Sequence, residues 1–80
     1  MTIQILGSGC PNCRNLEKNA REAAQKLGIQ ATFEKITDMD RIIEMGVLRT
    51  PGLAIDGTVK RSGKVFTPEE IAVTLREYVR

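Results

Sequence analysis

The sequence predicts an α/β domain whose elements follow in the order strand, helix, strand, helix, strand, strand, helix. Apolar residues alternate with polar ones in short segments and recur every three or four residues in longer ones. In addition, an Asp-Gly pair joins two of the short segments as a hairpin turn would. A strand, a long helix and a second strand form a right-handed crossover with parallel strands, and the hairpin adds an antiparallel pair. We therefore expect one four-stranded mixed sheet with helices on both faces.

The first half of the chain predicts a strand, a long helix and a second strand. Isoleucine alternates with glutamine in the segment 2–6, which the glycine-containing residues 7–9 interrupt. From 11 to 27, apolar residues recur at intervals of three and four, which places them on one face of a helix. This helix opens with a proline, which the first turn tolerates, and Gly28 is a common helix stop. Residues 29–36 carry β-branched and aromatic side chains between polar ones and predict the second strand.

The second half predicts a short helix, a hairpin and a final helix. The segment 37–46 has N-cap residues at its start and a glycine at its end, as a short helix requires. The segments 53–55 and 58–61 flank Asp56-Gly57, which is the strongest short signal for a two-residue turn. A capping box with proline at the first helical position predicts a last helix over 67–78. The residues expected on its buried side are Ile71, Leu75, Tyr78 and Val79.

Length and composition indicate a single domain, residues 1–80. A chain of 80 residues with 41% hydrophobic content can form one compact core but not two. Its 12 basic and 10 acidic residues are scattered and give a net charge of +2, which argues against a nucleic-acid partner. No segment approaches the roughly 20 consecutive apolar residues of a membrane span, and the N-terminus lacks the pattern of a signal peptide. We expect a cytoplasmic monomer with no membrane partner.

The chemistry is expected at Cys10 and Cys13, the two cysteines of the chain. Their spacing places the first thiol at the N-terminus of the long helix and the second one turn inside, on the buried face. The unpaired backbone N–H groups of the first turn and the helix dipole stabilise a negative charge at Cys10, and Arg14 and Lys18 add positive charge nearby. We therefore expect Cys10 to be the thiolate nucleophile. Cys13 is expected to be the resolving thiol that attacks the mixed disulfide.

Two other interpretations of the cysteine pair remain open. Cysteine is among the most buried residue types, so the pair can simply belong to the core. The two thiolates can also hold a soft metal or metalloid ion, which makes a soft-metal or metalloid binding protein the alternative function. A closed zinc site needs four ligands, and because the chain has no histidine, zinc would require a dimer, whereas Cu(I) fits one cysteine pair. The sequence itself indicates no metal site and no cofactor.

The chain resembles the small redox-active-disulfide proteins of thioredoxin-like fold. The features that carry the resemblance are Gly-Cys-Pro-Asn-Cys at the start of a long helix, Thr50-Pro51 about 40 residues later, and the hairpin that begins Leu53-Ala54-Ile55-Asp56-Gly57. The resemblance implies a thiol–disulfide oxidoreductase that exchanges a Cys10–Cys13 dithiol with protein disulfides. A thioredoxin-reductase-like electron donor would then reduce it again.

The resemblance also implies where substrates bind. A proline that enters a strand must avoid breaking the hydrogen-bond ladder, and a cis peptide bond is one solution. In the family, the proline that matches Pro51 is cis and packs beside the disulfide, and the backbone of the residue that matches Thr50 pairs with an extended substrate. Pro11 and Asn12, which lie between the cysteines, complete the predicted substrate contacts.

The chain departs from its better-known relatives at three places. The Trp-Cys-Gly-Pro-Cys signature of ordinary thioredoxins is absent, since Gly9 replaces the tryptophan and Pro-Asn replaces Gly-Pro. Gln4 stands about where ordinary thioredoxins bury an acidic residue that relays protons, so the proton step must be arranged differently here. Glutaredoxins follow their hairpin with Gly-Gly and an acidic residue that hold glutathione, whereas this chain has Arg61-Ser62-Gly63-Lys64. The resemblance therefore does not extend to glutathione as the reductant.

Overall fold

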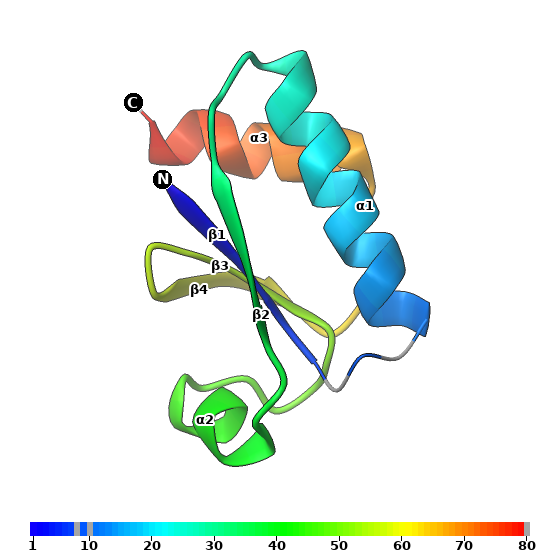
Figure 1. Cartoon of the computed structure of the whole chain (residues 1–80), viewed down its shortest axis with the longest axis vertical. Helices are drawn as coiled ribbons and strands as arrows, with labels where there is room; N and C mark the ends of the chain where they lie inside the picture. Colours follow the sequence, from blue (N-terminus) through cyan, green and yellow to red (C-terminus); the bar gives the residue numbers. More distant parts are fainter. Residues whose placement is uncertain (8, 10, 80) are drawn as a thin grey trace.

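In a computed structural model the chain has the predicted order of elements, and the structure describes residues 1–7, 9 and 11–79 (Figure 1). The strands are β1 (Thr2–Leu6), β2 (Thr32–Ile36), β3 (Gly52–Ile55) and β4 (Thr58–Ser62), and the helices are α1 (Pro11–Lys26), α2 (Met39–Glu44) and α3 (Pro68–Tyr78). The strands form one four-stranded sheet in the order β2-β1-β3-β4. β1 is parallel to β2 and antiparallel to β3, and β3 is antiparallel to β4. The predicted mixed sheet is therefore confirmed.

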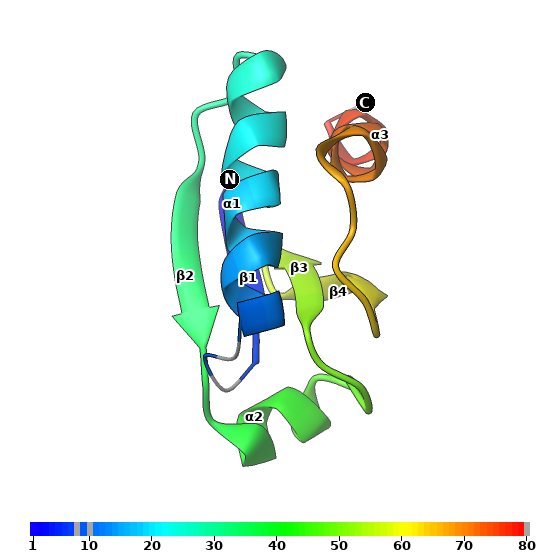
Figure 2. The ribbon, with the colours of Figure 1, turned by 90° about the vertical axis from the view of Figure 1, so that its right-hand side faces the viewer.

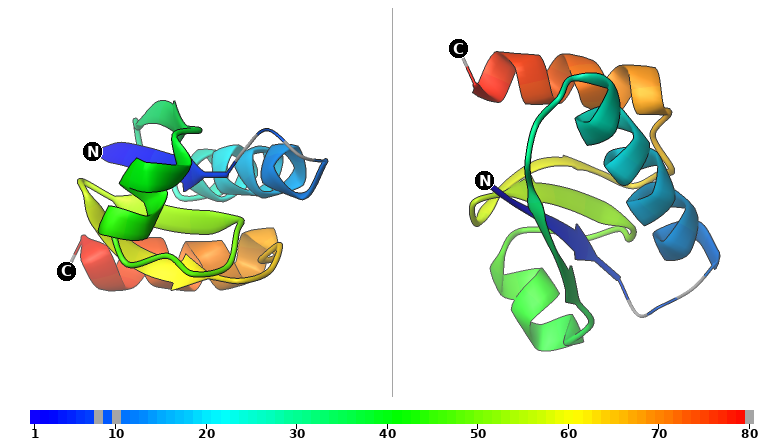
Figure 3. Two further views of the ribbon diagram at one scale, coloured as in Figure 1. Left: turned by 90° about the horizontal axis from the view of Figure 1, so that it is seen from below. Right: turned by 45° about the horizontal axis from the view of Figure 1, so that its top comes forward.

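Helices cover both faces of the sheet, as predicted. α1 and α3 pack on one face and contact each other, and α3 lies across the upper end of α1 (Figure 3). α2 packs on the opposite face, at the lower end of the molecule beyond the end of β2 (Figure 2). Because successive side chains of a strand point to opposite faces, β1 and β3 supply apolar residues to both layers.

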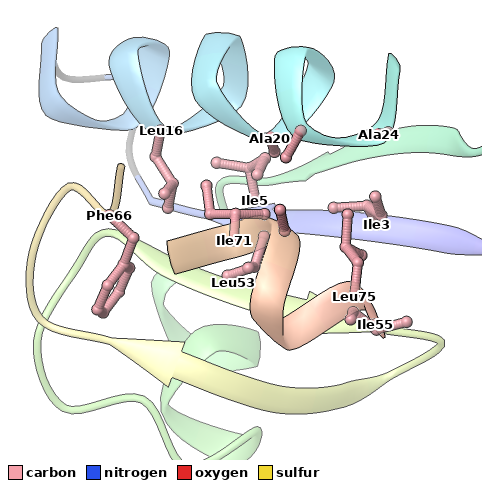
Figure 4. Close-up of a cluster of buried hydrophobic side chains, with 12 residues drawn as sticks. Ile3, Ile5, Leu16, Ala20, Ala24, Leu53, Ile55, Phe66, Ile71 and Leu75 are labelled. Atoms are coloured by element: carbon pink, nitrogen blue, oxygen red, sulfur yellow. The ribbon is translucent and has the colours of Figure 1, made fainter. Parts of the chain in front are cut away.

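The larger core lies between the sheet and the helices α1 and α3 (Figure 4). On the α1 side this core contains several alanines, whose small side chains let the helix backbone lie close to the sheet. Its buried members are Ile3, Ile5, Leu16, Ala20, Ala23, Ala24, Leu53, Ile55, Phe66, Ile71, Ala72 and Leu75. The smaller core, beneath α2, consists of Leu6, Ile36, Ile42, Val47 and Ala54.

The second strand begins at Thr32 and not at residue 29, so this predicted boundary is wrong. The end of α1 explains the difference. Gly28 has a φ of 68°, and its N–H donates to the carbonyl of Gln25 at 3.1 Å. The N–H of Ile29 donates to the carbonyl of Ala24 at 2.9 Å, which completes a Schellman motif. Ile29 therefore closes the helix and packs against the core, and the chain becomes a strand only three residues later.

The hairpin between β3 and β4 has the predicted two-residue turn. Asp56 has a φ of 50° and Gly57 a φ of 87°, and positive values at both positions are what a type I′ turn requires. The two strands pair antiparallel across this turn, as expected.

The final helix starts as predicted but has a different buried side. It opens with the capping box between Thr67 and Glu70. Of the four residues expected to face the core, the first two are buried, whereas Tyr78 is 36% exposed and Val79 is 55% exposed. The last turn lies at the rim of the sheet, where the hydroxyl of Tyr78 donates a hydrogen bond to the carboxylate of Asp56 in the hairpin turn. The helical period thus predicts on which side of the helix Tyr78 and Val79 lie, but it does not predict that the sheet ends before it could cover them.

Leu75→Ala should lower the free energy of unfolding by about 2–5 kcal/mol, because it removes a fully buried side chain from the larger core and leaves a cavity. Chemical denaturation followed by circular dichroism measures the change. Leu48→Ala is the matched control, since Leu48 is 88% exposed and the same truncation there should change the unfolding free energy by less than about 0.5 kcal/mol. Equal effects of the two substitutions would contradict the placement of Leu75 in the core.

Candidate active site

Cys13 lies in the first turn of α1 and is buried, with 5% of its surface exposed. It shares the buried face of the helix with Leu16 and Ala20, which follow at intervals of three and four residues. Its predicted partner Cys10 lies outside the described residues. The nucleophilic role of Cys10 and the resolving role of Cys13 therefore stay predictions.

Gly7 is the point at which the end of β1 approaches the thiol. Its N–H donates to the carbonyl of Ile36 at 2.9 Å, which extends the pairing of β1 with β2 by one residue. A Cβ atom at this position would overlap the Sγ atom of Cys13 and would lie 3.8 Å from the Cβ atom of Thr50. Because Gly7 has no side chain, its backbone can lie close to both the Sγ atom of Cys13 and Thr50 in the loop before β3. From the sequence, Gly7 was predicted only to end the strand, although a glycine directly after a strand also signals a close approach of this kind.

Thr50 and Pro51 lie at the same edge of the sheet as the start of α1. The register places Gly52, the first residue of β3, opposite Leu6, the last residue of β1, so the residue pair before β3 comes to the end of β1. Pro51 is buried, Thr50 is half-buried, and the peptide bond between them is cis. The carbonyl of Pro51 accepts a hydrogen bond from the N–H of Gly63 at 3.0 Å. Thr50 therefore lies next to Gly7, which in turn lies next to Cys13.

Pro11 and Asn12 are exposed at the start of α1. They point away from the face on which Cys13 is buried, because neighbouring residues of a helix lie on different sides. The structure therefore brings Cys13 and Thr50 together around Gly7 and leaves the two residues between the cysteines at the surface. Their predicted contact with a substrate remains a prediction.

A cavity of about 150 Å³ lies beside Cys13. It opens between the first two turns of α1 and the carboxyl end of β2. The residues that line it are Ile5, Gly7, Gly9, Cys13, Arg14, Glu17, Lys35 and Thr37. Arg14 is one of the two basic residues that the sequence placed near the thiols, whereas Lys18 is exposed further along α1.

Glu17 holds the least exposed of the charges around this cavity. Its side chain is 15% exposed, and its two carboxylate oxygens pair with Lys35 of β2 at 3.1 Å and with Arg21 of α1 at 3.0 Å. Burial raises the pKa of the Glu17 carboxyl, but the hydrogen bonds and positive charges of Lys35 and Arg21 outweigh it, so this pKa lies below its usual value. Glu17 is therefore ionised at neutral pH. Neither Glu17 nor Lys35 is among the residues predicted from the sequence; the spacing of four residues between Cys13 and Glu17 is the signal that points to Glu17.

Gln4 uses both ends of its amide to connect parts of the sheet. Its Nε2 atom donates to the carboxylate of Glu34 on β2 at 3.0 Å, and its Oε1 atom accepts from the N–H of Gly57 in the hairpin turn at 2.7 Å. It lies on the opposite face of β1 from Ile5, which lines the cavity, because side chains alternate along a strand. The amide thus connects β1 with β2 and with the hairpin turn.

No helix within residues 1–7, 9 and 11–79 is long and apolar enough to cross a membrane. In the same part of the chain, no group of three or more histidine, cysteine, aspartate or glutamate side chains is arranged to hold a metal ion.

Comparison with known proteins identifies the family. A family model described as Thioredoxin domain matches residues 1–76. The chain is 59% identical over 71 residues to a thioredoxin of Methanothermobacter thermautotrophicus, an alignment that covers 89% of this chain and 92% of that protein. It is 39% identical over 79 residues to a thioredoxin of Methanocaldococcus jannaschii, with 99% of this chain and 91% of that protein covered.

These matches run over nearly the whole chain and agree with the arrangement of its helices and strands. The resemblance to thioredoxin-like proteins and the thioredoxin-like fold that it implied are therefore confirmed. The chain belongs to the thioredoxin family of thiol–disulfide oxidoreductases.

Proposed function

We propose that this chain reduces protein disulfides by dithiol–disulfide exchange, with Cys10 as the nucleophile and Cys13 as the resolving cysteine. The observation that carries the proposal is the position of Cys13, buried in the first turn of α1 and in close approach to Gly7 beside the loop that holds Thr50. The thioredoxins of the two archaea support the same chemistry. The N-terminus of a helix favours a thiolate, and a position one turn inside the helix brings a second thiol within reach of the first.

The exchange takes place in two steps. The thiolate of Cys10 attacks one sulfur of a substrate disulfide, so that a mixed disulfide forms and the other substrate sulfur leaves as a thiolate and takes up a proton. Cys13 then loses its proton, and its Sγ atom attacks the Sγ atom of Cys10. The mixed disulfide breaks, the second substrate thiol is released, and a Cys10–Cys13 disulfide remains. The substrate has gained two electrons and two protons, which a thioredoxin-reductase-like donor returns to the chain.

Thr50 and Pro51 are the proposed contacts for the substrate backbone. Thr50 is half-buried near Cys13, so a peptide that adds to this edge in an extended conformation brings its disulfide to the thiols. Pro11 and Asn12 are exposed at the start of α1 and leave room for a protein substrate to approach. We further propose that residues 1–80 act as one domain, as a monomer, in the cytoplasm.

Replacement of either cysteine should separate the two steps. Cys10→Ser should reduce a disulfide-bonded test protein such as insulin no faster than dithiothreitol alone, because no nucleophile remains. Cys13→Ser should complete the first step and accumulate a mixed disulfide with the substrate, which mass spectrometry of the trapped adduct detects. Wild-type turnover by both variants would contradict the proposal. Thiols protected by a metal that copurifies with the chain would favour the soft-metal function instead.

Gly7→Ala should slow the reduction of protein disulfides by about 10- to 100-fold, because the new Cβ atom displaces the sulfur of Cys13 from its position. The same displacement should expose Cys13 and speed its alkylation by iodoacetamide in the reduced protein. Gly52→Ala is the matched control: its Cβ atom would lie 3.3 Å from the methyl groups of Val47, a contact that strains the smaller core and leaves the sulfur in place. Equal alkylation rates in the two variants would contradict the close approach at Gly7.

A further inference from the structure

The two steps of the proposed exchange place opposite demands on the two thiols. Cys10 must lose its proton easily, whereas Cys13 must keep its proton until the mixed disulfide has formed. Otherwise two thiolates would lie side by side, and each would disfavour the other. The N-terminus of α1 and the nearby basic residues favour the thiolate of Cys10, but these same groups act on Cys13 one turn away.

The charged groups around Cys13 come from two elements. Among the described residues, Arg14 and Glu17 of α1 and Lys35 of β2 line the cavity beside it, and Arg21 pairs with Glu17 from the next turn of the helix. The cavity residues from β1, from its following loop and directly after β2 carry no charge. The loop before β3 contains Arg49, which does not line the cavity. Among the described residues, the carboxylate of Glu17 therefore lies near three cations, which are Arg14, Lys35 and Arg21.

Glu17 is placed to act on Cys13. Residues four apart on a helix lie on the same side, with about 5–6 Å between their Cβ atoms. Both side chains line the same cavity. The Glu17 side chain is 15% exposed, whereas Lys35 is 64% and Arg21 is 56% exposed, so water screens the carboxylate least of the three.

We propose that Glu17 adjusts the redox behaviour of the cysteine pair: its carboxylate, held in the cavity by Lys35 and Arg21, disfavours a thiolate at Cys13 and so keeps this cysteine protonated until it resolves the mixed disulfide. The inference rests on the proposed function of Cys13 as the resolving cysteine. Glu17 does not contact the substrate in this proposal; the charge of its carboxylate acts on Cys13.

The carboxylate acts as a fixed charge and not as the acceptor of the thiol proton. An ordinary cysteine has a pKa of about 8.5. The pKa of Glu17 lies below its usual value, since the hydrogen bonds and charges of Lys35 and Arg21 outweigh the effect of burial, so this carboxylate is a weaker base than an ordinary thiolate and does not take up the thiol proton. The negative charge is therefore constant across neutral pH, whatever the redox state of the cysteines.

The direct test is a titration of Cys13 alone. In a Cys10→Ser background the remaining thiolate is followed by its absorbance at 240 nm as the pH is raised. Addition of Glu17→Gln should lower the pKa of Cys13 by about 0.5 to 1, because a nearby negative charge is lost. Glu17→Asp retains the charge and should restore most of the difference. Lys35→Met should move the pKa in the opposite direction.

Glu22→Gln is the matched control, because Glu22 is an exposed carboxylate of the same helix that does not line the cavity. It should leave the pKa of Cys13 unchanged within about 0.2. If Glu17→Gln moved this pKa no further than Glu22→Gln does, or raised it, the inference would be overturned. Lower thermal stability of Glu17→Gln without a change in this pKa would likewise overturn it, since only a structural role would remain.

The reduction potential of the intact Cys10–Cys13 pair gives a second readout. Glu17→Gln should favour the reduced form, because it stabilises a thiolate that exists only in that form, and the equilibrium with dithiothreitol should shift by up to about tenfold, or about 30 mV toward less negative values. The titration needs no turnover, so it separates the two proposals. A shifted pKa in a chain that fails to reduce insulin would overturn the proposed function alone, and normal reduction with no shift would overturn the role of Glu17 alone.

Discussion

The central position of β1 is the constraint on which the arrangement of the site depends. This strand is paired on both sides, parallel to β2 and antiparallel to β3, and four of its five residues are buried. Because β1 runs antiparallel to β3, its last residue lies opposite the first residue of β3, and because it runs parallel to β2, both of these strands end at the same edge. The start of α1, the loop before β3 and the carboxyl end of β2 are thereby brought together around one thiol.

The charges along the first turns of α1 act in opposite directions. At the start of the helix, unpaired N–H groups and Arg14 favour negative charge, and one turn further a carboxylate held by two cations opposes it. A thiol–disulfide oxidoreductase with two chemically identical side chains needs such a difference between their environments. In this chain the amide of Gln4 is used within the sheet, and the negative charge near Cys13 comes from Glu17 of the same helix.

Much of the fold could be predicted from the sequence, because local patterns decide it. The period of α1 and the Asp56-Gly57 turn depend on neighbours in the chain, and both predictions are confirmed. Predictions were wrong where the length of an element or the size of the sheet matters. Ile29 was predicted in a strand although it closes a helix, and Tyr78 was predicted in the core although the sheet ends before it. Periodicity indicates a direction but not what lies in that direction.

The same limit applies to the site. The cysteine motif and Thr50-Pro51 could be found because their spacing is characteristic of a family. Lys35 could not, since its relation to Cys13 depends on a neighbouring strand, and at Gly7 the sequence indicates a close approach but not which group approaches. A single sequence contains no direct record of distances between segments that are remote in the chain.

The alanines on the buried face of α1 have a consequence for how the thiol site can change over evolution. Ala20, Ala23 and Ala24 lie in the half of the helix away from Cys13, and each is almost completely buried. The helix is a nearly rigid rod of about 1.5 Å per residue, so its distance from the sheet at these alanines also fixes its tilt at the other end. A larger side chain at any of these three positions would change the tilt of α1 and move the Sγ atom of Cys13 away from β1. Residues that never meet a substrate therefore determine the alignment of the sulfur.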